Sequence, residues 1–312
     1  MPPSTPEPIH RDTRGVFIIA ATPFAQDGAL DLDSAERLVD FYAGCGVNGM
    51  TILGVMGEAP KLTPDEARAF AARMIARAPF PVIVGVSGGG LDAMRALAQD
   101  VMAMGAAGVM VAPPAGTAPE DRVAAYYAAV CHHLGPDVPV CLQDYPQLTG
   151  VKISTDTILR LTVEHPQIVM LKHEDWPGLA KLSAIRTAEA QTERPRLSIL
   201  TGNSALFLAQ EMARGADGAM TGYCYPEMLV QVVQGWGTDP DRAEDIFDAH
   251  LPLVRYEQQP GLGLAVRKEV LRRRGAIASA AVRAPGPKLS AADQAEVTRL
   301  IARLDRRLAA LG

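Results

Sequence analysis

A lysine and a glutamate stand two positions apart at the end of a short apolar segment. The segment spans 167–175, with four apolar residues from Ile168 to Leu171 followed by Lys172-His173-Glu174. An apolar run of this length between turn-forming residues suits a strand buried on both faces. Because side chains alternate along a strand, Lys172 and Glu174 share one side and His173 faces the other. An amine and a carboxylate would then lie together at the mouth of an apolar core.

Such a pair can perform covalent and acid–base chemistry. Burial favours the neutral amine of a lysine, and a neutral amine is a nucleophile toward ketones. A carboxyl group beside it can take and return protons. The segment alone leaves a second interpretation open, in which the lysine reaches out at the rim of a sheet and forms a structural ion pair with the glutamate.

Strand-length apolar segments alternate with helical patterns along most of the chain, and these elements must position the pair. Besides the lysine segment, the predicted strands span 16–21, 49–53, 81–85, 108–112, 138–142, 197–200 and 218–221. Eight β-then-α units predict an α/β fold in which a parallel sheet closes into a (β/α)8 TIM barrel. An open doubly wound sheet is the alternative, but no GxGxxG follows the first strand and no Walker A motif occurs.

Helical patterns replace the strands after about residue 240, near 241–256, 261–274 and 290–310. We therefore divide the chain into an N-terminal tail (1–12), a catalytic barrel (13–238) and a C-terminal extension of helices packed on the barrel (239–312). Helix-capping residues support several helix starts. Asp33 or Ser34 is the expected cap of the first helix, and Thr63 is the expected cap of the second.

Composition narrows the possible partners. The net charge is −5, and no basic block is long enough to indicate nucleic acid or an anionic membrane as a partner. No apolar segment approaches the roughly 20 residues of a membrane span, and the first ten residues lack the apolar region of a signal peptide. The four cysteines show neither a disulfide framework nor zinc-ligand spacing. We expect a cytoplasmic protein that binds a small molecule without a metal.

The remaining candidate site residues follow the C-terminal ends of the predicted strands, where the active site of such a barrel lies. The turn after the second strand is rich in glycine, and its backbone N–H groups could receive a carboxylate. Lys172 and Glu174 are the predicted catalytic residues. The predicted substrate-binding residues are Val55, Met56, Gly57, Gln143, Tyr145, Gly202, Asn203, Ser204 and Thr221.

Several short motifs occur together in the order found in one family. They are Ala21-Thr22-Pro23-Phe24, the GxxGE turn from Gly54 to Glu58, Pro146 with Thr149-Gly150, Lys172, Gly202, and Gly215-Ala216-Asp217-Gly218. With them, residues 13–235 resemble the dihydrodipicolinate synthase / N-acetylneuraminate lyase family of class I (Schiff-base) aldolases. The resemblance implies a (β/α)8 barrel, a lysine that forms a covalent imine with a 2-keto acid in place of a cofactor, and usually a homotetramer.

The sequence departs from this family where the family's proton relay normally lies. Val55 and Met56 replace two hydroxyl residues of the glycine turn, and Gln143 replaces the catalytic tyrosine. Pro114 and Ala115 replace the tyrosines that help dihydrodipicolinate synthases. These replacements argue against lysine biosynthesis and against sialic acid cleavage.

The segment from Lys172 to Gly178 resembles the 2-keto-3-deoxy-L-arabonate dehydratases of the same family. In that subgroup a glutamate two residues after the lysine takes the role of the tyrosine, which implies that Glu174 moves the protons. The expected reaction is dehydration of 2-keto-3-deoxy-L-arabonate to 2-oxoglutarate semialdehyde. Retro-aldol cleavage to pyruvate and an aldehyde is the alternative on the same scaffold, and a non-catalytic sensor of 2-keto acids is the third.

Overall fold

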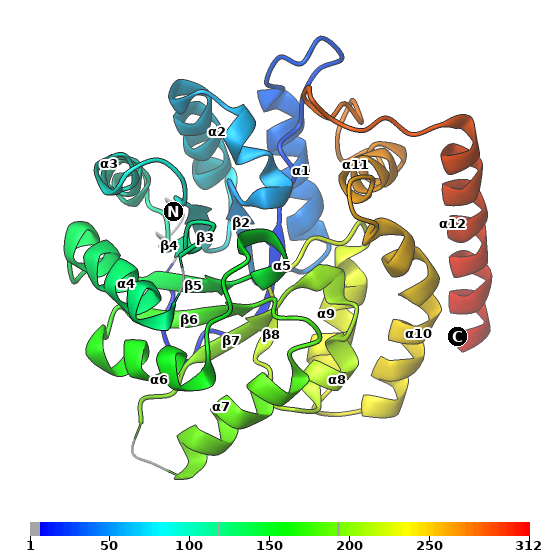
Figure 1. The fold of residues 1–312 in the computed structure, drawn as a ribbon. Helices are drawn as coiled ribbons and strands as arrows, with labels where there is room; N and C mark the ends of the chain where they lie inside the picture. The colour runs from blue at the N-terminus through cyan, green and yellow to red at the C-terminus, as the bar shows by residue number, and fades with distance from the viewer. Residues whose placement is uncertain (1–6, 118, 192–193) are drawn as a thin grey trace, which may run out of the picture.

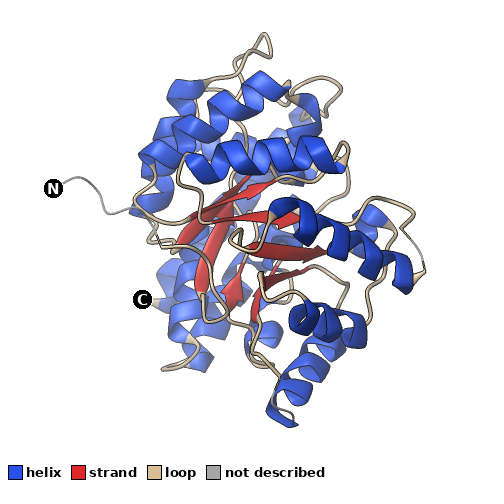
Figure 2. Ribbon diagram, turned by 90° about the vertical axis from the view of Figure 1, so that its left-hand side faces the viewer, coloured by secondary structure: helices blue, strands red, loops and turns tan. Residues whose placement is uncertain are grey.

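The computed structural model describes residues 7–117, 119–191 and 194–312. Within these ranges, parallel strands β1 to β8 form a closed barrel in sequence order, with β8 paired to β1. Figure 2 shows the strands at the centre and the helices around them. The strands are β1 (Gly15–Ile19), β2 (Gly49–Ile52), β3 (Val82–Gly85), β4 (Gly108–Val111), β5 (Val140–Asp144), β6 (Ile168–His173), β7 (Ser198–Thr201) and β8 (Gly218–Ala219). The predicted (β/α)8 barrel is confirmed.

Helices connect the strands and then continue beyond the barrel. Those up to β8 are α1 (Leu32–Gly44), α2 (Pro64–Arg77), α3 (Leu91–Ala103), α4 (Glu120–Leu134), α5 (Pro146–Thr149), α6 (Thr155–Glu164), α7 (Leu179–Gln191) and α8 (Leu208–Met212). After β8 come α9 (Pro226–Gly235), α10 (Pro240–Glu257), α11 (Gly263–Arg273) and α12 (Ala291–Leu311). Short 3₁₀ turns span Val55–Gly57, Ala59–Lys61 and Asn203–Ala205.

Some element boundaries differ from those predicted. Two of these differences change whether a site residue lies within a strand or beyond its end. The fifth strand is predicted to end at Leu142, but β5 runs to Asp144 because Gln143 and Asp144 continue the ladder opposite Lys172 and His173. The eighth strand ends at Ala219, so Thr221 lies just beyond it. The first helix begins earlier than predicted, because the carboxylate of Asp31 accepts the backbone N–H of Ser34.

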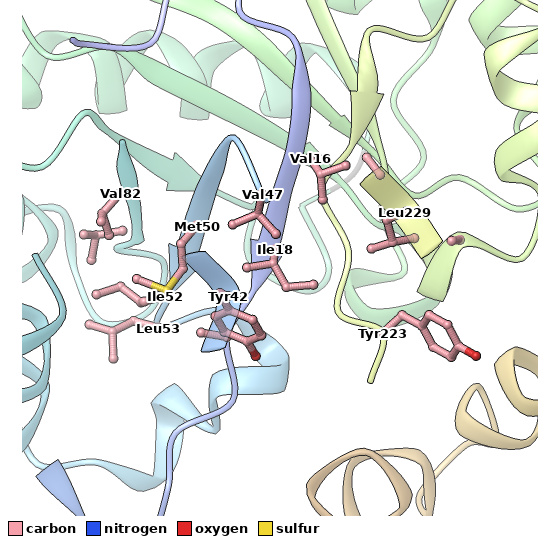
Figure 3. Close-up of a cluster of buried hydrophobic side chains, with 14 of the residues drawn as sticks. Val16, Ile18, Tyr42, Val47, Met50, Ile52, Leu53, Val82, Tyr223 and Leu229 are labelled. Carbon is pink, nitrogen blue, oxygen red and sulfur yellow. The ribbon is translucent and has the colours of Figure 1, made fainter. Parts of the chain in front are cut away.

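Alternation along the strands separates two hydrophobic clusters. Val16 and Ile18 point outward into the layer between strands and helices, as the close-up in Figure 3 shows. Phe17 and Ile19 point inward and form the interior of the barrel together with Met170 of β6. Because Met170 faces the interior, the same alternation directs Lys172 and Glu174 inward and His173 outward.

Segments near both ends of the chain pack against the barrel. Ile9, in the segment that the sequence assigns to the N-terminal tail, is buried in the interior cluster and donates its N–H to the carbonyl of Ala107. The last helices stand beside the barrel, with α12 alongside α10 and next to α11 in Figure 1. No helix in the described part of the chain is long and apolar enough to cross a membrane.

Candidate active site

A cavity opens at the C-terminal ends of the strands. Its empty space is about 410 Å³, including the part open to solvent at its mouth. All but two of the predicted site residues line it: Val55, Met56, Gln143, Tyr145, Lys172, Glu174, Asn203, Ser204 and Thr221. Residues from five strand ends therefore meet at one site.

Lys172 and Glu174 face each other inside this cavity. The amine Nζ of Lys172 lies 3.1 Å from the carboxylate Oε2 of Glu174, and the two residues are 4% and 7% exposed. Lys172 therefore does not reach out at the rim of the sheet, as the second interpretation expects, whereas the ion pair with Glu174 that this interpretation also expects is present. The distance allows a proton to pass directly between the two groups.

Gln143 and Tyr145 occupy the β5 side of the same cavity. The amide Nε2 of Gln143 donates to Oε2 of Glu174 at 2.7 Å, which orients the carboxylate. Burial raises the pKa of the Tyr145 phenol, and the nearby Glu174 carboxylate raises it further. Tyr145 therefore stays protonated at neutral pH, where it can donate a hydrogen bond but cannot act as a base.

The two predicted residues that do not line the cavity lie behind its wall. The N–H of Gly57 donates to the carbonyl of Gly54 within the 3₁₀ turn, so this N–H is engaged and the predicted carboxylate cradle has one donor fewer. Gly202 packs against Glu174, and a Cβ at this position would overlap the Glu174 side chain. Direct contact of these two glycines with a substrate stays a prediction.

A polar cluster on the outer side of β6 supports the strand end. His173 contacts the carbonyl of Gly178 through Nε2, and Lys181 bridges the carboxylates of Asp144 and Asp175 at 2.7 and 2.8 Å. Burial lowers the pKa of His173 to about 4 and raises the pKa of Asp144 to about 6, the latter against the opposing effect of Lys181. His173 is therefore neutral at physiological pH and faces away from the cavity.

The glycine turn is held by a buried ion pair with the C-terminal extension. Glu58, which adopts a left-handed backbone conformation at the end of this turn, lies 2.5 Å from the amine of Lys268 and 2.9 Å from that of Lys61. Its carboxylate also accepts the backbone N–H of Arg283. The GxxGE glutamate thus anchors the turn that carries Val55 and Met56, rather than reaching the cavity itself.

Sequence reasoning missed four residues that line the cavity: Ile19, Gly222, Gln258 and Arg267. Arg267 belongs to α11, outside the barrel, yet it is 1% exposed and reaches Ser204. The helical pattern gave no signal for it, because the residues of α11 from Ala265 to Leu271 are all buried and Arg267 does not stand out on one face.

The closed barrel, with a buried lysine and a carboxylate at the C-terminal ends of its strands, has the architecture of a barrel lyase. A model of the Dihydrodipicolinate synthetase family matches residues 12–304, and the chain belongs to this family. The family and its dehydratase and aldolase relatives make the protein a lyase.

Individual relatives carry several different names. The chain is 32% identical to L-2-keto-3-deoxyarabonate dehydratase of Azospirillum brasilense, with 94% of each chain covered. It is 29% identical to the probable 2-dehydro-3-deoxy-D-pentonate aldolase YjhH of Escherichia coli (strain K12), over 71% of this chain and 74% of that one. A crystal structure of dihydrodipicolinate synthase from Rhodopseudomonas palustris is 48% identical, with a TM-score of 0.94 and coverage of 95% and 99%.

Proposed function

We propose that this protein dehydrates a 2-keto-3-deoxy sugar acid through an imine on Lys172, with 2-keto-3-deoxy-L-arabonate as the expected substrate. The observation that carries the proposal is the 3.1 Å approach of the Lys172 amine to the Glu174 carboxylate inside the cavity. The dehydratase name of the Azospirillum brasilense relative, which matches over 94% of both chains, supports the choice of substrate.

In the first steps the substrate becomes covalently bound to Lys172. The ammonium of Lys172 gives up a proton to solvent, and the free amine attacks the C2 ketone. The carbinolamine takes up a proton from solvent and loses water, which gives a protonated imine while Glu174 remains a carboxylate. This imine withdraws electrons and acidifies the hydrogens on C3. Glu174 then removes one C3 proton, and the electron pair moves into an enamine.

Elimination follows from the enamine. Its electrons expel the C4 hydroxyl, and the proton on Glu174 leaves with that hydroxyl as water. Proton shifts that remove hydrogens from C5 and its hydroxyl and add hydrogens to C3 and C4 leave an aldehyde at C5. Hydrolysis of the imine returns Lys172 and releases 2-oxoglutarate semialdehyde, so the net change is the loss of one water.

The site chemistry suits a carboxylate rather than a phenol as the proton carrier. Gln143 stands where the family's tyrosine would be and donates to Glu174, but an amide side chain acts as neither an acid nor a base at neutral pH. Tyr145, with its raised pKa, keeps its own proton. Among the groups that line the described cavity, Glu174 is therefore the base best placed beside Lys172.

Product analysis tests the proposal. The purified protein is incubated with 2-keto-3-deoxy-L-arabonate, and the products are identified by mass spectrometry. A five-carbon semialdehyde, lighter than the substrate by one water, is expected. Pyruvate with a two-carbon aldehyde would instead establish retro-aldol cleavage, the activity that the name of the Escherichia coli relative favours.

A second measurement separates both enzymes from a non-catalytic sensor. Pyruvate and borohydride are added to the protein, and the intact mass is recorded. An imine-forming enzyme gains the mass of the reduced adduct on one lysine. A protein that binds 2-keto acids without imine chemistry gains none, and this result would refute the proposed mechanism.

A further inference from the structure

The guanidinium of Arg267 enters the cavity from outside the barrel, and one of its nitrogen atoms has no hydrogen-bond partner in the part of the chain that the structure describes. Its Nε donates to Glu257 of α10 at 2.5 Å, and Nη2 donates to the hydroxyl of Ser204 at 3.2 Å. Nη1 is buried and has no hydrogen-bond partner among the described residues. A buried donor without a partner is costly, so this nitrogen atom is poised for an acceptor that the protein itself does not supply.

The fold makes room for this nitrogen atom. Gly222, just beyond β8, also lines the cavity, and a Cβ at this position would overlap Nη1 of Arg267. Gly222 does not have a positive φ, so the backbone conformation itself does not require glycine. A residue larger than glycine at position 222 would therefore fill the space beside the guanidinium.

The charge around Arg267 indicates which acceptor suits it. Arg267 and Glu257 form a buried ion pair whose side chains are 2% and 0% exposed, and the two charges cancel. The other oxygen of Glu257 accepts the backbone N–H of Cys224 at 3.1 Å, so the carboxylate is held in place. Nη1 therefore offers hydrogen bonds without a surplus positive charge, which suits a neutral hydroxyl better than a second carboxylate.

Arg267 has no hydrogen bond to Lys172 or Glu174 among the described residues. Its contacts are with Ser204 after β7 and Gly222 after β8, whereas Glu174 is oriented by Gln143 of β5. We propose that Arg267 is a specificity-determining residue that donates from Nη1 to a hydroxyl oxygen on the substrate tail beyond C3. The inference rests on the proposed function in one respect, namely that Lys172 fixes C2 of a 2-keto acid.

The test compares ligands with and without that hydroxyl. The ligands are 2-keto-3-deoxy-L-arabonate as substrate, and 2-oxopentanoate and pyruvate as competitive inhibitors. The main variant is Arg267→Met/Glu257→Gln, which removes both charges, because removing the arginine alone would leave a buried carboxylate unpaired. We expect KM for the hydroxylated substrate to rise about 10- to 100-fold, while the inhibition constants of both hydroxyl-free acids change less than about twofold.

Gly222→Ala gives a second variant that keeps the ion pair. The added methyl would overlap Nη1 and Cζ of Arg267 and would also crowd the carbonyl oxygen of Ile19, so the guanidinium must shift. The same selective loss is expected with both charges still present. Arg267→Lys serves if the double variant does not fold, since the lysine keeps a charge for Glu257 but cannot place a nitrogen atom at the position of Nη1. Circular dichroism confirms the fold of each variant before kinetics are measured.

Two results would overturn the proposal. One is an equal weakening of all three ligands, which would assign Arg267 to the carboxylate common to them or to the fold. The other is unchanged KM for the hydroxylated acid. If wild-type protein does not turn over 2-keto-3-deoxy-L-arabonate, the proposed substrate fails. Arg267 is then tested by the ligand concentration that gives half-maximal borohydride trapping, measured for 2-keto-3-deoxy-D-gluconate and compared with that for 2-oxopentanoate.

Discussion

Gly202 lies directly behind the side chain of Glu174, where a Cβ would overlap the glutamate's Cγ, Cδ and Oε1. The glycine N–H also donates to the carbonyl of His173 at 3.0 Å, so the two strand ends are fixed relative to each other. The position of the carboxylate over Lys172 thus depends on the missing side chain at residue 202.

Gly202→Ala should reduce turnover by displacing Glu174 while leaving Lys172 in place. We expect kcat to fall by about 10- to 100-fold and borohydride trapping of pyruvate to be retained. Gly237→Ala is the matched control, because a Cβ there meets no atom within 4 Å. Equal loss of trapping and turnover in Gly202→Ala would show that the glycine supports the whole site rather than the carboxylate.

Lys172→Ala should abolish both turnover and the mass gain on trapping, because no other amine lines the described cavity beside Glu174. Lys152→Ala, at an exposed position, serves as the control for lysine removal and should behave as wild type. Intact-mass spectrometry after pyruvate and borohydride makes the measurement. A trapped adduct in the Lys172 variant would place the imine elsewhere.

Glu174→Gln should separate imine formation from proton transfer. Glutamine keeps an oxygen that can accept from Gln143, but it cannot carry a proton. The expected loss in kcat is about 10²- to 10⁴-fold, with trapping of pyruvate largely kept. Stopped-assay product quantification checks the rate. A variant close to the wild-type rate would move the proton-carrying role to another group, with Tyr145 the next to test.

Glu211 of α8 gives the structure a pH dependence of stability. Burial raises its pKa to about 8, opposed by a hydrogen bond with Thr201, and the Glu174 carboxylate adds a smaller upward shift. The folded protein therefore holds a proton that the unfolded chain releases, so this contribution to stability is full below the ordinary glutamate pKa of 4.5 and is lost as the pH rises through about 8.

Glu211→Gln removes this titration. Relative to wild type, the variant should gain free energy of unfolding between pH 5 and pH 8, on the order of 3 kcal/mol. Urea unfolding of both proteins at the two pH values measures the difference. A constant difference between the two curves would show that Glu211 is already ionised in the folded protein.

Much of the site followed from the sequence because its signals are local. Alternation within one strand places Lys172 and Glu174 on the same side, and Met170 in the barrel interior shows why. The rule that active sites lie at the C-terminal strand ends brought Gln143, Ser204 and Thr221 to the same cavity. These predictions needed only the alternation of side chains along a strand, which repeats every two residues, and the fold class.

The remaining features depend on contacts that no local pattern encodes. Arg267 reaches the cavity from a helix beyond the barrel, and its partner Glu257 lies on the preceding helix. The engaged N–H of Gly57 depends on the 3₁₀ geometry of its turn, which the glycine spacing does not reveal. Ile9 closes the bottom of the barrel from a segment whose composition resembles a tail.

Two neighbouring residues of α11 contribute to the open end of the barrel. Arg267 forms part of the cavity wall, and Lys268 forms an ion pair with Glu58 at the end of the glycine turn. A fragment cut off at residue 238 would therefore be an incomplete enzyme, with a loosened turn and a missing wall. The proposed role of Arg267 predicts further that a chimaera carrying the last helices of another family member would exchange part of its substrate preference along with them.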